Sequence, residues 1–138
     1  MHFTKLASLV LAAAALSSFA APAAADDTKS LEVKRLVFAR GIDGHEPQDA
    51  ASAFSAKEDR VYAFVELANP GADGNVEVVF QPPAGASFAV PLKVSGKASH
   101  FRTWAFTRRA HEAGEWTVVV RAAGNKVLAR QSFTVTSR

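Results

Sequence analysis

From Leu31 onward, apolar and polar residues alternate in short runs that are separated by clusters of Gly, Pro, Asn and Asp. Runs of this length rich in Val, Phe, Thr and Trp are typical of β-strands, whereas an amphipathic helix needs an apolar stripe of period 3.6. No convincing stripe of that kind occurs after Asp26. The pattern predicts about seven strands, at residues 31–40, 60–68, 76–81, 87–94, 99–107, 115–121 and 126–136.

Two of these runs have residues that predict their place in a sheet. Residues 60–68 (RVYAFVELA) carry bulk at odd and even positions, which is typical of a central strand covered on both faces. Residues 87–94 contain Pro91, which has no amide hydrogen to donate, so this run is predicted at an edge, where a partner would add a strand. The long connection 45–59 has one large apolar residue, Phe54, and is predicted as a loop with a helical turn over one end of the core.

Short strands joined by Gly-rich, Pro-rich and Asn-rich turns predict an all-β fold, an immunoglobulin-like antiparallel β-sandwich. Residues 41–44 and 122–125 are predicted turns, because both combine Gly with neighbours suited to a chain reversal. A closed barrel is the alternative architecture. The Cys, Trp, Cys hallmark of true immunoglobulin domains is missing, since the chain has no cysteine. We expect one domain, residues 31–138, because a chain of this length builds one core.

The first 25 residues have the layout of a cleaved export signal. Lys5 supplies the positive start, and residues 6–19 form an apolar run that is shorter than the about 20 residues a membrane span needs. Ala23 to Ala25 offers small residues for signal peptidase, so cleavage is expected near Ala25, before Asp26. Residues 26–30 are expected to be flexible. The mature protein is thus expected in the periplasm or secreted, with no membrane span.

Charge and cysteine content narrow the set of partners. The formal net charge is +3, and basic and acidic residues are interspersed rather than gathered in blocks, so no nucleic-acid partner is expected. A chain with no cysteine has no disulfide, no thiolate metal site and no lipid anchor of the bacterial lipoprotein kind. No cofactor is expected.

Three blocks of the sequence resemble a known family. RVYAFVEL at 60–67, FRTW at 101–104 and GEWTVVV at 114–120 occur in the order and approximate spacing of a bacterial envelope family known as domain of unknown function 2914. The closing KVLARQSF at 126–133 is similar to it too. The chain departs from the family pattern at 78–80 and 109–112, where members tend to carry more aromatic residues. This resemblance implies a β-fold and an envelope location, and it implies no activity.

Signatures of catalysis are weak. The pairs His45-Glu46 and His111-Glu112 lack the second histidine of H-E-x-x-H, and no G-x-S-x-G elbow is present. His100, His111 and Glu115 are the residues that a small metal-dependent or hydrolytic enzyme would use here. We expect no metal site and no enzyme, and this trio is the alternative.

The strongest candidates for binding are Arg102, Trp104, Arg108 and Arg109, because Trp and Arg combine a large contact area with polar groups. Trp116 alternates with valines and is predicted in the core. The leading hypothesis is a non-catalytic binding or accessory module of the bacterial envelope, whose partner is an unknown envelope protein or glycan. A carbohydrate-binding module that uses Trp104 is a further alternative.

Overall fold

The computed structural model describes residues 31–68 and 73–137. The expected signal peptide at 1–25 and the flexible segment at 26–30 lie outside these residues. The regular elements of the described part are strands and one short 3-10 turn, so the all-β prediction is confirmed. No helix in the described part is long and apolar enough to cross a membrane. The elements are β1 Glu32–Asp43, β2 Glu46–Ala50, β3 Ala53–Ser55, β4 Val61–Ala68, β5 Gly74–Gln81, β6 Phe88–Val94, β7 His100–Thr107, β8 Gly114–Ala122, η1 Ala123–Asn125 and β9 Lys126–Thr136.

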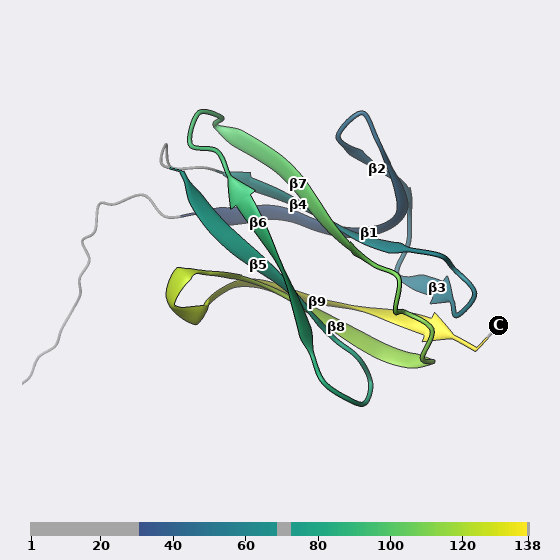
Figure 1. The fold of residues 1–138 in the computed structure, drawn as a ribbon. Coiled ribbons are helices and arrows are strands. Elements are labelled where there is room, and N and C mark those ends of the chain that lie inside the picture. The colour runs from purple at the N-terminus through teal and green to yellow at the C-terminus, as the bar shows by residue number, and fades with distance from the viewer. Residues whose placement is uncertain (1–30, 69–72, 138) are drawn as a thin grey trace, which may run out of the picture.

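The strands form two sheets that pack face to face as a sandwich (Figure 1). The four-stranded sheet has the order β2-β1-β4-β7, and the five-stranded sheet has the order β3-β9-β8-β5-β6. Every pairing is antiparallel except that of β3 with β9. As predicted, β4 is internal and β6, which contains Pro91, is an edge strand. β6 contacts β7 across the two sheets, so two edge strands lie on the same side of the sandwich.

One hydrophobic core fills the space between the sheets. Alternate residues of β4, from Val61 to Leu67, face inward and are fully buried, and alternate residues of β5 and β8 meet them from the other sheet. Trp116 is 2% exposed, which confirms its predicted core position. Its ring stacks on Phe133 with centroids 5.9 Å apart, and its Nε1 donates a hydrogen bond of 2.9 Å to the carbonyl of Glu112. Aromatic packing therefore closes one end of the core.

The predicted loop with a helical turn at 45–59 is wrong. This segment contains β2, which pairs with β1, and β3, which pairs in parallel with the end of β9. β2 (EPQDA) is polar and mostly exposed, and β3 has only three residues, so neither shows the apolar alternation that marks a strand. Phe54 in β3 is 1% exposed and packs edge-on against Phe133, with ring centroids 5.6 Å apart. Burial of the Phe54 side chain therefore stabilises the pairing of β3 with β9, although the local sequence does not predict a strand here.

The turn predicted at 41–44 lies further along the chain. β1 continues through Gly41 to Asp43, and the reversal uses only Gly44 and His45, whose φ angles are 59° and 66°. Two consecutive residues with positive φ are typical of the tightest β-hairpin turns. The hairpin predicted at 122–125 is confirmed, with η1 between β8 and β9.

Candidate functional site

The outward side of the four-stranded sheet carries an unusual set of aromatic and charged side chains. On β7, Arg102 and Phe106 are exposed and Trp104 is half-buried, while the alternate residues Ala105 and Thr107 are buried. Strand alternation therefore places Arg102, Trp104 and Phe106 on one face. Across the sheet their register partners on β4 are Glu66, Phe64 and Tyr62, respectively.

The tip of the β1–β2 hairpin lies over this face. The Glu46 carboxylate accepts a hydrogen bond from Arg35 Nη2 at 3.1 Å and forms an ion pair with Arg102 Nε at 3.3 Å. The His45 ring meets the Trp104 ring edge-on, with centroids 5.7 Å apart. These contacts join the hairpin to a strand more than fifty residues away in sequence, and they restrict the orientations of Arg102 and Trp104.

Arg35 organises the centre of the face. Its Nε donates to Glu66 at 2.9 Å, and its guanidinium lies 4.9 Å from the centroid of the Phe64 ring, which is fully buried although it points away from the core. The hydrogen bond with Glu66, followed by that with Glu46, raises the pKa of Arg35 above its usual value. A raised pKa means that this stabilisation is complete below the usual Arg range and is lost only as pH rises through the folded value. Arg35 is therefore charged at neutral pH.

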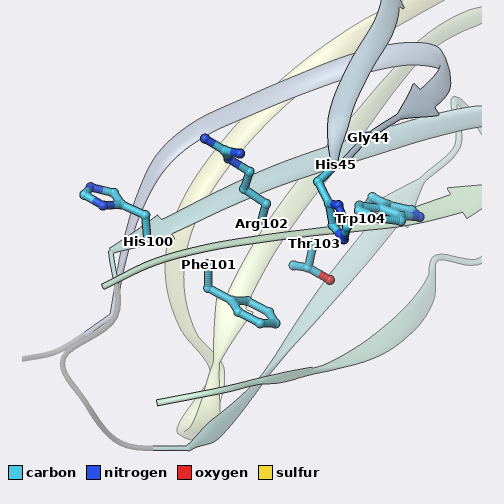
Figure 2. Close-up of a pocket in the computed structure, with 7 residues that line it drawn as sticks. All are labelled: Gly44, His45, His100, Phe101, Arg102, Thr103 and Trp104. Atoms are coloured by element: carbon cyan, nitrogen blue, oxygen red, sulfur yellow. The ribbon is translucent and has the colours of Figure 1, made fainter. Parts of the chain in front are cut away.

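A groove of about 590 Å³ follows the outer edge of β7 (Figure 2). Figure 2 shows Phe101 and Thr103 on one side of the strand and His100 and Arg102 on the other, so the groove includes both faces of the edge. We call it the β7-edge groove. Its lining residues are Gly44, His45, His100, Phe101, Arg102, Thr103 and Trp104.

A second cavity, of about 550 Å³, meets the β7-edge groove at Phe101. It is formed near the ends of β5, β6 and β7, and two lysines, Lys93 and Lys97, are among the side chains that line it. Asp73 also lines it, and its Oδ1 accepts a hydrogen bond of 2.7 Å from the Gly96 amide. The second cavity therefore continues the β7-edge groove beyond the start of β7.

The structure separates the four predicted binding residues. Arg102 and Trp104 line the β7-edge groove. Arg108 lies just after β7, with its guanidinium 6.0 Å from the ring centroid of Phe106. Arg109 lies 4.7 Å from the ring centroid of Phe88 on β6, in the other sheet. Arg102 and Trp104 are thus together, Arg108 extends the same face, and Arg109 belongs to a different surface.

The trio considered for catalysis is not brought together. His100 begins β7 and His111 follows its end, so about seven residue steps of roughly 3.3 Å, or about 23 Å, separate the two ends of the strand. His111 Nδ1 lies 2.7 Å from the carbonyl oxygen of Ala56, and Glu115 pairs with Thr134 at the start of β8. No group of three His, Asp or Glu side chains within 31–68 and 73–137 is arranged to hold a metal ion.

Sequence reasoning missed the contribution of the hairpin tip. The sequence suggests His45 and Glu46 only as a weak candidate for metal binding. In the structure, His45 packs against Trp104 and Glu46 forms an ion pair with Arg102. The only local signal is Gly44, because a glycine in a polar stretch marks a turn. Nothing in the local sequence indicates that the tip reaches β7.

Two comparisons with known proteins concern sequence. The model of a family described as "Protein of unknown function (DUF2914)" matches residues 80–135, which confirms the resemblance over that range. The match runs from the end of β5 into β9 and includes β7 and the Trp116 region. A search of curated proteins finds no match.

The solved structures that match this chain belong to much longer proteins, of which it spans less than a third. β-Glucosidase 3B from Thermotoga neapolitana, in complex with α-D-glucose, matches with a TM-score of 0.52 and 15% identity, over 78% of this chain and 16% of that chain. Wild-type OgpA from Akkermansia muciniphila matches with a TM-score of 0.43 and 11% identity, over 80% of this chain and 29% of that chain. At 15% identity, the similarity to β-glucosidase 3B shows the fold alone.

Proposed function

We propose that this chain is an exported, non-catalytic binding module of the bacterial envelope, and that its ligand contacts the β7-edge groove. The observation that carries the proposal is the position of Arg102 and Trp104, which line the groove at a strand edge and are held by the hairpin tip. Side chains of these two types supply much of the energy at protein binding sites.

The site is ordered before any ligand arrives. Glu46 holds the Nε side of Arg102, while the Arg102 side chain remains 45% exposed. The His45 ring packs edge-on against the Trp104 ring. Trp104 is also the register partner of Phe64 on β4. Because these side chains are already restricted, they lose less conformational entropy when a ligand binds. A ligand therefore meets a surface with an aromatic ring and charged donors already in position.

Export and lack of catalysis are supported by separate observations. Residues 1–25 have a positive start, an apolar run and small residues before Asp26, as export signals do. His100 begins β7, whereas His111 lies four residues beyond its other end at Thr107, so the two histidines considered for an active site are far apart. The surface of the groove thus supports recognition better than a reaction.

A glycan is the second candidate ligand, and Trp104 is the observation that favours it. Sugar rings pack on aromatic faces, and His45, His100 and Thr103 supply hydrogen-bonding groups in the same groove. An envelope protein is favoured over a glycan, because the edge-on contact with His45 leaves Trp104 only half-exposed.

The test uses the protein exported by a bacterial host from the full sequence. Its amino terminus should be Asp26, and it should be retained on an envelope fraction from the bacterium that encodes it. Trp104→Ala should weaken retention about tenfold. The control is Val127→Ala, because Val127 is 50% exposed on β9, in the other sheet.

Treating the envelope fraction with protease separates the two ligand classes. Loss of Trp104-dependent retention after the treatment identifies a protein ligand, and persistence identifies a glycan. Equal retention of the Trp104→Ala and Val127→Ala proteins would overturn the proposed site.

A further inference from the structure

We infer that the β7-edge groove accepts an extended acidic segment of a partner protein, which pairs with β7 as an additional strand. This inference rests on the proposed function and names the class of its ligand. β7 ends the four-stranded sheet, and within the described residues no strand pairs with its outer side. Alternate backbone N–H and C=O groups of an edge strand point outward and pair readily with another chain.

β7 is the best acceptor among the four end strands of the two sheets. β2 contains Pro47, β6 contains Pro91, and proline removes a donor from an edge. β3 has three residues. β7 (HFRTWAFT) has eight residues and neither proline nor glycine. Strand addition is therefore assigned to β7 rather than to the strand that contains Pro91.

The charges around the edge favour carboxylates. Arg102 lies in the groove, and Lys93 and Lys97 line the cavity that continues it. Among the residues that the structure describes, Asp73 is the one acidic residue that lines either cavity, and its carboxylate already accepts a hydrogen bond from the Gly96 amide. Glu46 contacts Arg102 through Nε, and a guanidinium has further N–H donors that suit a second carboxylate.

The two faces of β7 define an alternating ligand. Side chains of an added strand that lie beside His100, Arg102 and Trp104 would face the charged outer surface. Those on the other face would lie beside Phe101, which packs against the core, and Thr103. Because neighbouring residues of a strand point to opposite faces, the segment should alternate acidic with apolar side chains.

The probe is a synthetic peptide of about ten residues that alternates Glu and Val, a length that covers β7 at about 3.3 Å per residue. It should bind the exported protein, and the amide NMR signals of residues 100–104 should shift. A Lys-Val peptide should bind about tenfold more weakly or worse. Glu-Val peptides that are N-methylated at every second residue, in each of the two registers, test the backbone pairing, and one of the two should lose binding.

Matched variants test the charge. Arg102→Gln should weaken binding of the Glu-Val peptide about tenfold. Arg121→Gln should leave it unchanged, because Arg121 is paired with Glu77 at 2.8 Å in the other sheet. Equal binding of the Glu-Val and Lys-Val peptides, or equal binding of both N-methylated forms and the parent peptide, would overturn strand addition. If Trp104-dependent envelope retention persists in that case, the proposed function stands and only the ligand class fails.

Discussion

Gly114 shows how a single residue permits the start of β8. Its φ is 132°, a value that side chains other than glycine rarely adopt. A Cβ at this position would also lie 2.9 Å from Pro83 Cγ in the loop after β5. Two residues later, Trp116 enters the core. The Gly and the Trp of the GEWT block are therefore both explained by the local structure.

Substituting Gly114→Ala should lower the free energy of unfolding by about 2 kcal/mol or more, because backbone strain and a steric clash act together. Urea denaturation measures this change. Gly74→Ala is the control, since its Cβ would meet nothing within 4 Å, and it should change stability by less than about 1 kcal/mol. Equal costs for the two substitutions would contradict this account of Gly114.

At the scale of elements, β3 is short but is attached to the core by one aromatic side chain. Phe54 contacts Phe133 on β9. The guanidinium of Arg40 lies 5.0 Å from the centroid of the Phe54 ring. Main-chain contacts reinforce the attachment, since Thr134 donates its amide to the Ser52 carbonyl at 2.9 Å. This strand forms one edge of the five-stranded sheet, beside β9.

Substituting Phe54→Ala should therefore lower the free energy of unfolding by about 3 kcal/mol, because a fully buried ring is removed and a cavity is left. Phe106→Ala should cost less than about 1.5 kcal/mol, since Phe106 is 41% exposed. Thermal and urea denaturation of the two proteins give the comparison. A cost for Phe54→Ala no larger than that for Phe106→Ala would show that β3 is only loosely attached.

At the scale of the whole molecule, the two sheets depend on a shared core. Buried residues of β1, β4 and β7 belong to one cluster with those of β5, β8 and β9. Separating the sheets would expose the inner faces of both, and the described chain has no disulfide to hold a partly open form. Neither sheet is therefore expected to remain folded without the other.

Unfolding in urea should occur as one transition, as is usual for small single domains. The far-ultraviolet circular dichroism signal, which reports strands, and the near-ultraviolet signal of the aromatic core should change at the same midpoint. The slope should be in the range of about 1–3 kcal/mol per molar urea. Two separated midpoints would mean that the sheets unfold independently.

Much of the sandwich could be predicted locally. Bulky residues on both faces of the VYAFVEL run predicted a central strand, and Pro91 predicted an edge; β4 and β6 have these places in the sheets. Trp116 was placed in the core because it alternates with valines. β2 and β3 were missed, since a polar strand of five residues and a strand of three carry too little apolar pattern. Their pairing depends on residues distant in sequence.

By itself, the sequence determined the fold class, the strands of the inner core and the residue types available for binding, because burial of alternate side chains depends on a period of two that can be seen along the chain. Tertiary structure alone decided that Arg102 and Trp104 share a groove with His45 and that Arg109 lies elsewhere. The site depends on a hairpin tip reaching across two strands, and contacts of that range leave no periodic trace in the local sequence.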